Sequence, residues 1–137
     1  MEIINKRKTY KSNNTLVYSC QYHVIWATKY RRKVLNEDVQ KRLKELILEK
    51  QEEYGYEIFE IEIMPDHVHL LIDCNPQLGI YKIIGKIKGY TSNILRNEFP
   101  ELKSRIPTLW TRSKFISTVG AVSLEAVKKY IEDQKNK

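Results

Sequence analysis

Two consecutive segments of alternating apolar and polar residues, joined by a Pro-Asp turn, constrain the fold most strongly. In residues 56–64 the alternation gives two faces of three residues each: Phe59, Ile61 and Ile63 on one, and Ile58, Glu60 and Glu62 on the other. In residues 67–72, after Pro65 and Asp66, His67 and His69 share one face, whereas Val68, Leu70 and Ile72 share the other. Because side chains alternate between the two faces of a strand, this pattern predicts an antiparallel hairpin.

The segments around this hairpin have the composition of two more strands and three helices. Asn36 is a predicted N-cap followed by two acidic residues, and Gly55 ends the helix that starts there. The predicted order is strand 17–28, helix 36–55, strands 56–64 and 67–74, helix 80–95, strand 115–119, and helix 122–137, which Ser123 can cap. This split βαβ pattern predicts an α+β fold, a ferredoxin-like or RRM-like βαββαβ antiparallel sheet. Two helices would cover one face, and the additional C-terminal helix would lie elsewhere.

Length and charge narrow the class of protein. The 137 residues are expected to form one domain, with residues 1–15 as a flexible basic arm. No apolar run is long enough to cross a bilayer and the charged N-terminus lacks a secretory signal, so a cytoplasmic protein with no membrane partner is expected. Cys20 and Cys74 are interpreted as reduced, structural thiols. The formal net charge of +7 favours nucleic acid as the partner.

His67 and His69 are candidate metal ligands. Imidazole is the commonest neutral metal ligand, and two imidazoles on one strand face can converge on one ion. If the two long helices cover the opposite face, only the C-terminal helix remains to cover the histidines. The third ligand stays open among four oxygen donors: Glu60, Glu62, Asp73 and Gln134. Ligand type does not choose between magnesium, manganese and zinc. The isolated His23 is interpreted as structural.

Tyr130 and Gln134 lie one helical turn apart in the C-terminal segment and therefore face the same way. A phenol with a pKa near 10 is a poor nucleophile at neutral pH unless a metal polarises the group it attacks. A nearby divalent ion would do this to a phosphodiester. Taken together, Tyr130, Gln134, His67 and His69 predict a phosphoryl-transfer site.

Six short stretches, in this order and spacing, carry a resemblance to a known family. They are Tyr-His-Val-Ile-Trp at 22–26, Lys-Tyr-Arg-Arg-Lys-Val-Leu at 29–35, Met-Pro-Asp-His-Val-His-Leu-Leu at 64–71, Leu-Trp at 109–110, Ser-Thr-Val-Gly at 117–120 and Tyr-Ile-Glu-Asp-Gln at 130–134. The chain resembles the single-tyrosine HUH transposases, the small TnpA-type enzymes of bacterial and archaeal insertion sequences, in which HUH denotes histidine, hydrophobic, histidine. The resemblance extends from about Val17 to Gln134.

The resemblance implies a function and a site. His67 and His69 would bind a divalent metal, Mg²⁺ or Mn²⁺, with Gln134 as the third protein ligand. Tyr130 would attack a phosphodiester of single-stranded DNA and leave a 5′-phosphotyrosine link and a free 3′-hydroxyl. The family acts on hairpins near the element ends, as homodimers that can pair the histidines of one subunit with the tyrosine helix of the other. Gly120 falls where the family has a flexible hinge to that helix.

The resemblance also suggests a basic DNA-binding surface and shows one departure. The candidate DNA contacts are Lys29, Arg31, Arg32, Lys33, Lys82 and Lys86. The family commonly has a glycine-rich, aromatic stretch after its Leu-Trp pair, whereas this chain has Thr111-Arg112-Ser113-Lys114-Phe115. The function of that loop therefore does not carry over.

Two other readings of the same residues stay open. One is a related hairpin-processing HUH nuclease that does not mobilise an element, since its catalytic core would look alike. The other is a non-catalytic RNA- or DNA-binding module of RRM-like fold. Such modules stack bases on aromatic residues exposed on the sheet, whereas this sheet face is predicted to carry His67, His69 and carboxylates, which favours catalysis.

Overall fold

The computed structural model describes residues 1–7, 11–12, 16–119 and 124–136, and these form an α+β fold around one five-stranded antiparallel sheet. The strand order is β1-β5-β6-β4-β7, and a separate two-stranded sheet pairs β2 with β3. The strands are β1 (Glu2–Ile3), β2 (Lys11–Ser12), β3 (Val17–Tyr18), β4 (Gln21–Ala27), β5 (Tyr56–Met64), β6 (His67–Cys74) and β7 (Phe115–Thr118). The helices are η1 (Lys29–Arg31), α1 (Glu37–Glu49), α2 (Gln51–Tyr54), α3 (Ile80–Glu98), α4 (Glu101–Arg105), α5 (Leu124–Asp133) and η2 (Gln134–Asn136). The predicted α+β class and split βαββαβ order are confirmed.

The hairpin of β5 and β6 forms as predicted, with one irregularity. Met64 pairs with His67 across the Pro-Asp turn, and Ile61 pairs with Leu70 further along. A β-bulge between Ile58 and Glu60 inserts an extra residue into β5. Because of the bulge, Ile58 packs in the same hydrophobic core as Ile61, so its predicted place on the face of Glu60 and Glu62 is wrong.

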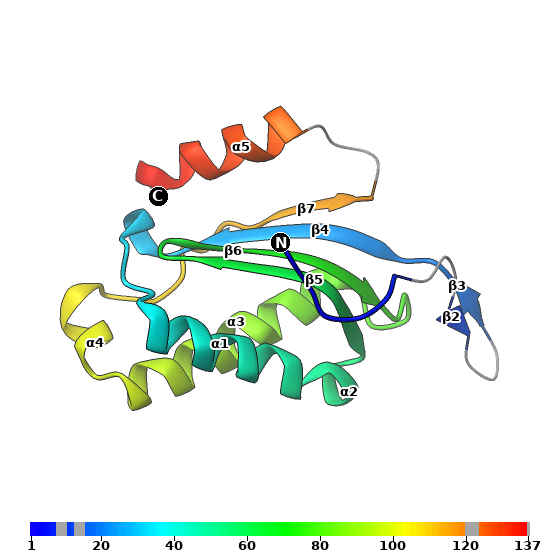
Figure 1. Cartoon of the computed structure of the whole chain (residues 1–137), viewed down its shortest axis with the longest axis horizontal. Coiled ribbons are helices and arrows are strands. Elements are labelled where there is room, and N and C mark those ends of the chain that lie inside the picture. The colour runs from blue at the N-terminus through cyan, green and yellow to red at the C-terminus, as the bar shows by residue number, and fades with distance from the viewer. Residues whose placement is uncertain (8–10, 13–15, 120–123, 137) are drawn as a thin grey trace.

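The first residues of the chain lie along the edge of the main sheet. Strand β1 pairs with the outer edge of β5, and Ile4 N donates to Phe59 O at 2.8 Å. The Asn5 side chain donates to Ile58 O at 2.6 Å, beside the bulge. The strand predicted over 17–28 is divided into β3, which pairs with β2, and β4, which belongs to the main sheet. The pair β2–β3 projects from one end of the molecule (Figure 1).

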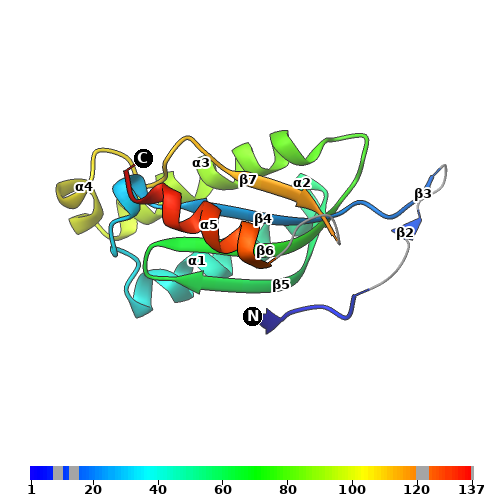
Figure 2. The same cartoon turned by 90° about the horizontal axis from the view of Figure 1, so that it is seen from above.

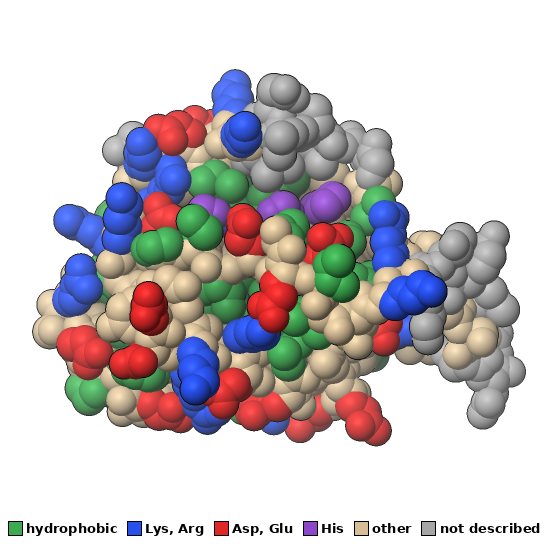
Figure 3. All heavy atoms as spheres, in the orientation of Figure 1, with side chains coloured by type: hydrophobic (Ala, Val, Ile, Leu, Met, Phe, Trp, Pro, Cys, Tyr) green, Lys and Arg blue, Asp and Glu red, His purple; other side chains and the backbone are tan. Residues whose placement is uncertain are grey.

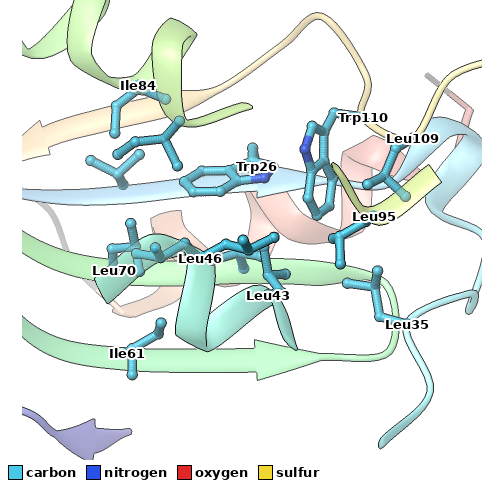
Figure 4. Packing of buried hydrophobic residues seen from close by; sticks show 14 of the residues in the cluster. Trp26, Leu35, Leu43, Leu46, Ile61, Leu70, Ile84, Leu95, Leu109 and Trp110 are labelled. Atoms are coloured by element: carbon cyan, nitrogen blue, oxygen red, sulfur yellow. The ribbon is translucent and has the colours of Figure 1, made fainter. Parts of the chain in front are cut away.

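Helices α1 and α3 cover one face of the sheet and enclose the core (Figure 1). Asn36 Oδ1 accepts a hydrogen bond from Val39 N at 3.0 Å and so caps α1, as predicted. Gly55 ends α2 with a φ of 76°, a left-handed conformation that favours glycine. The core includes an edge-to-face pair of Trp26 and Trp110 with ring centroids 5.8 Å apart (Figure 4).

Helix α5 lies on the other face of the sheet, where it crosses above β4 and β6 (Figures 1 and 2). Because β4 pairs with both β6 and β7, the register determines which side chains lie beneath it. His69 is opposite Ile25, which is opposite Phe115, and all three share the face of α5. Gly120, the predicted hinge, and Ser123, the predicted cap, lie outside the described residues. Within the described part of the chain, no helix is both long and apolar enough to cross a membrane.

Candidate active site

His67 stands at the start of β6, on the face that α5 covers, and is almost buried. Its Nδ1 donates to Asp66 Oδ1 at 2.8 Å. This bond fixes the ring orientation, and in the neutral form of the ring it leaves Nε2 as the nitrogen that can bind a metal. A histidine that binds a metal typically donates its other ring N–H to a carboxylate in this way. The local geometry of His67 therefore fits a metal ligand.

Asp66 is held in turn by Arg31 from η1. Arg31 Nε donates to Asp66 Oδ2 at 2.8 Å, and Arg31 Nη1 reaches Glu132 Oε2 of α5 at 3.3 Å. Tyr30 and Arg31 have φ values of 56° and 52°. Left-handed backbone at a residue other than glycine costs about 1 kcal/mol or more, so the surrounding contacts must hold this turn in place.

His69 lies two residues further along β6 and meets a third histidine. His69 Nε2 is 3.3 Å from His23 Nδ1 of β4, so one ring donates to the other. Burial, followed by the neighbouring His23, lowers the pKa of His69 to about 4, and burial also lowers the pKa of His23. Both rings are therefore neutral at physiological pH, the form that binds metals. His69 would meet a cation through its other nitrogen or after giving up the contact with His23.

His23 belongs to the site face, although the sequence led to its interpretation as structural. The signal that could have placed it is the alternation in β4. Tyr22, Val24 and Trp26 point to the helices α1 and α3, so His23 must point to the opposite face. Figure 3 shows histidine side chains in a row at the surface between α5 and the sheet.

Tyr130 reaches the sheet from α5. Its ring packs against Phe115 of β7 with the centroids 5.1 Å apart. The Tyr130 hydroxyl is shielded from solvent and has no hydrogen-bond partner among the described residues. Burial raises the pKa of Tyr130 to about 12, so the phenol is protonated at neutral pH. As an isolated group it is a weak nucleophile, and it would need a nearby cation to make attack efficient.

Gln134 follows directly after α5, in η2, which packs against η1. Its side chain is buried, and Oε1 has no hydrogen-bond partner in the part of the chain that the structure describes. An unpaired buried amide oxygen is costly unless a partner arrives. Among the described residues, no three His, Cys, Asp or Glu side chains come together as a metal site. A cation held by imidazoles and the amide of Gln134 fits both observations.

The other candidates for a third ligand are less well placed. Asp73 lies at the opposite end of β6 from His67, directly across from Glu57. Glu62 is opposite His69 in the register, but its carboxylate is 3.7 Å from the N-terminal ammonium. Glu60 is opposite Leu71, one step further from His67 along the strand pair. Asp73 and Gln134 are both buried with an unpaired oxygen among the described residues, but only Gln134 lies at the end of the sheet where η2 packs against η1.

The candidate DNA contacts do not form one surface. Lys29, Arg32 and Lys33 lie at or next to η1, beside the end of α5, whereas Lys82 and Lys86 are exposed on α3 on the other side of the sheet. The Arg31 side chain forms an ion pair with Asp66, so its role differs from that of the basic residues next to it in the sequence.

The loop at 111–115 is anchored by a lysine that sequence reasoning missed. Lys88 of α3 is buried, and its Nζ donates to Thr111 O at 2.7 Å and Ser113 O at 3.2 Å. Burial lowers the pKa of Lys88 to about 8. Lys88 follows the buried Ile84 by four residues, which is about one helical turn. This spacing could have indicated that the Lys88 side chain points inward. The loop leads directly into Phe115, which contacts Tyr130.

Comparisons with known proteins identify the family. Residues 16–134 match the family described as Transposase IS200 like. The ISDra2 transposase TnpA of Deinococcus radiodurans is 36% identical over 129 residues, which cover 93% of this chain and 92% of that protein. The transposase for insertion sequence element IS200 of Salmonella typhimurium is 28% identical over 119 residues, 85% of this chain and 78% of that protein.

Solved structures give the same result. A crystal structure of a Deinococcus radiodurans protein assigned as a transposase superposes with a TM-score of 0.83 at 35% identity, and covers 93% of this chain and 99% of that one. A REP-associated tyrosine transposase bound to a REP hairpin shares the fold, with a TM-score of 0.56 at 11% identity over 95% of this chain and 69% of that one. The chain therefore belongs to the family of IS200-like transposases.

Proposed function

We propose that this chain is a metal-dependent, single-stranded DNA transposase that cleaves and rejoins DNA at hairpin-marked element ends through a 5′-phosphotyrosine intermediate. One observation carries the proposal. The helix that brings the buried, unpaired hydroxyl of Tyr130 and leads to the buried, unpaired amide oxygen of Gln134 lies over the sheet face of His67 and His69. Two unpaired polar atoms on a helical segment that covers the face of two imidazoles are suited to a phosphate and a cation.

In the proposed reaction, Tyr130 Oη forms a bond to the phosphorus of a DNA phosphodiester, and the bond from phosphorus to O3′ breaks. The phenolic proton is lost and O3′ takes up a proton, which leaves a free 3′-hydroxyl. A divalent cation, Mg²⁺ or Mn²⁺, would polarise the phosphate and stabilise the charge on the departing oxygen. One phosphoester replaces another, so the reverse attack by a 3′-hydroxyl can rejoin DNA without an external source of energy.

The chain's own residues have distinct tasks in this proposal. His67 and His69 would supply nitrogen ligands, and Gln134 would supply an oxygen ligand from the tyrosine helix itself. Phe115 packs against the ring of Tyr130 and limits its position over the sheet. Because Gln134 and Tyr130 lie on one continuous helical segment, docking of that segment would bring the nucleophile and the third ligand into the site together.

A non-catalytic module of RRM-like fold is disfavoured by the cover on the sheet. RRM-like modules leave their sheet aromatics open for stacking with bases. Here Phe115 packs against Tyr130, and the neighbouring strands present His23 and His69 instead of aromatics of that kind. Strand rejoining distinguishes an enzyme that mobilises an element from one that only processes hairpins for the cell. Only rejoining completes transposition, so an assay of the rejoining step tests this question.

The test is a covalent adduct. Labelled single-stranded DNA carrying an element-end hairpin is incubated with the protein and Mn²⁺, and the denatured mixture is run on a gel. Tyr130→Phe is expected to abolish the protein–DNA adduct and to retain binding, whereas Tyr90→Phe, a control on α3 whose ring packs against Tyr54 on the helix side of the sheet, is expected to keep the adduct. An adduct formed by Tyr130→Phe at the wild-type level would refute the proposed nucleophile.

The proposal includes a homodimer with shared active sites, and a mixing experiment tests it. Tyr130→Phe and His67→Ala are each expected to be inactive. If the histidines of one subunit work with the tyrosine helix of the other, a mixed dimer of the two variants contains one intact site and regains cleavage. If each subunit uses its own helix, every site in the mixture lacks one residue and the mixture stays inactive.

A further inference from the structure

We propose that Arg31 is a positioning residue that couples the orientation of His67 to the docking of α5. The proposal rests on the proposed function, because it assigns a task to residues next to the ligands of that site. It starts from a continuous chain of contacts: His67 Nδ1 to Asp66, Asp66 to Arg31 Nε, and Arg31 Nη1 to Glu132 of α5. One guanidinium thus joins the carboxylate behind His67 to the helix of Tyr130.

The turn that carries Arg31 is fastened to Asp66 by the backbone as well. Thr28 N donates to Asp66 O at 3.0 Å, and Thr28 Oγ1 is 3.2 Å from the same oxygen and 2.6 Å from Arg32 O. Two consecutive residues other than glycine, Tyr30 and Arg31, adopt positive φ in this turn. Such a conformation persists only where the surrounding contacts over-determine it, and it often marks a functional position. The side chain of Arg31 is therefore presented to Asp66 from a fixed base.

The Asp66 end of the contact controls His67. Both Asp66 oxygens are in use, one by the imidazole and one by the guanidinium, and the carboxylate is mostly shielded from solvent. Removing the arginine fork would leave this carboxylate without its cation and free to rotate away from His67. Loss of such an outer partner of a ligating histidine typically lowers metal affinity by about 10- to 100-fold. Lysine would keep the charge but not the two-directional geometry of the guanidinium.

The Glu132 end of the contact controls α5. Glu132 lies between Tyr130 and Gln134 in the sequence, and its other oxygen accepts from Lys135 of the same helical segment. Its side chain is 62% exposed, so the pair with Arg31 is a weak contact at the rim. We expect its removal to shift the docking equilibrium of α5 only about two- to fivefold.

The experiment uses two readouts that need neither DNA nor cleavage. Mn²⁺ affinity is measured by calorimetry, and docking is measured by amide hydrogen exchange over residues 128–134. Arg31→Lys is expected to lower Mn²⁺ affinity about 10-fold and to speed exchange in this segment. Glu132→Gln is expected to speed exchange about two- to fivefold and to change Mn²⁺ affinity by less than about threefold. Since Glu132 is exposed, this second variant tests the contact even if Arg31→Lys folds poorly.

The matched controls are Arg42→Lys and Glu98→Gln. Arg42 Nε donates to Glu98 Oε1 at 2.8 Å, an arginine–glutamate pair of the same kind that joins α1 to α3 on the other side of the sheet. Both controls are expected to leave Mn²⁺ affinity and exchange over 128–134 unchanged. Wild-type Mn²⁺ affinity in Arg31→Lys, or unchanged exchange in Glu132→Gln, would overturn the coupling. The proposed function would then still stand if Tyr130→Phe abolishes the adduct, and it would fall separately if that adduct persists.

Discussion

Asp73, at the end of β6 far from His67, allows a quantitative test of how burial of a carboxyl group affects the stability of the protein. Neither carboxylate oxygen has a hydrogen-bond partner among the described residues, and the residue is 1% exposed. Burial raises the pKa of Asp73 to about 6 from the ordinary value of 3.8; Lys11 opposes this effect and Glu57 adds to it. The folded protein therefore holds the proton more tightly than the unfolded chain does.

The sign of the pH dependence follows from this difference. Protonated Asp73 contributes stability that is fully present below pH 3.8 and is lost as the pH rises through about 6. The whole stabilising contribution of the Asp73 proton is about 3 kcal/mol in the free energy of unfolding. About 2 kcal/mol of it is lost between pH 4.5 and pH 7.5. Asp73→Asn does not titrate at this position. The free energy of unfolding of the variant, minus that of the wild type, is therefore expected to rise by about 2 kcal/mol over this range.

Urea unfolding of both proteins at pH 4.5, 6.0 and 7.5 measures the difference. Subtracting one protein from the other cancels the titration of the remaining groups, and it also cancels the pH-independent cost of burying an amide. A difference that stays constant across the three pH values would refute the reasoning. Asp73→Asn is also expected to keep wild-type Mn²⁺ affinity, because Asp73 lies at the opposite end of β6 from His67. Lost Mn²⁺ binding would place it in the site after all.

Three further predictions concern the scaffold and are measured by urea unfolding. Asn36→Ala removes the cap of α1 and is expected to cost about 1 kcal/mol, and an unchanged midpoint would show that the cap contributes nothing. Gly55→Ala places a Cβ 2.4 Å from a neighbouring leucine at positive φ and is expected to destabilise by more than about 1 kcal/mol, whereas Gly85→Ala, with open space around it, is expected to stabilise. Lys88→Met leaves carbonyls of the 111–113 segment unpaired and is expected to cost about 1 to 3 kcal/mol and to speed amide exchange in that loop, unlike Lys86→Met on the exposed face.

The elements with strong local signals could be predicted from the sequence. The β5–β6 hairpin follows from alternation and a turn dipeptide, and the start of α1 follows from Asn36 and the two acidic residues after it. These features depend on residues near one another in the chain. The shared face of His67 and His69 is of the same kind, since it follows from the geometry of a single strand.

Features that depend on distant partners were missed or misplaced. The bulge at Ile58 could not be predicted, because Ile58, Glu60 and Glu62 alternate regularly in the sequence and only the pairing of β5 with β6 reveals the extra residue. The contact of His23 with His69 could not be predicted, because His69 lies on a strand that is adjacent in the sheet but not in the sequence.

The contact of Arg31 with Asp66 was missed for a related reason. Within a run of basic residues, the sequence does not distinguish the arginine that turns inward at positive φ from those that stay in solvent. Lys88 was missed because a lysine in a helix is normally exposed, and only the unpaired carbonyls of a distant loop make its burial favourable. In both cases a polar partner far away in the chain determines the position.

The short turn between β5 and β6 has a consequence for the order of folding. Residue 64 pairs with residue 67 in this hairpin, whereas β4 must bring residue 27 to residue 67, and β7 must bring residue 115 to residue 25. Contacts between near neighbours require little loop closure, and distant pairings slow folding. We therefore expect the strand that carries His67 and His69 to form early in folding. The C-terminal helix α5, which carries Tyr130, is expected to pack onto the sheet after the sheet has formed. A partly folded chain would then hold the histidines in place before Tyr130 reaches the sheet.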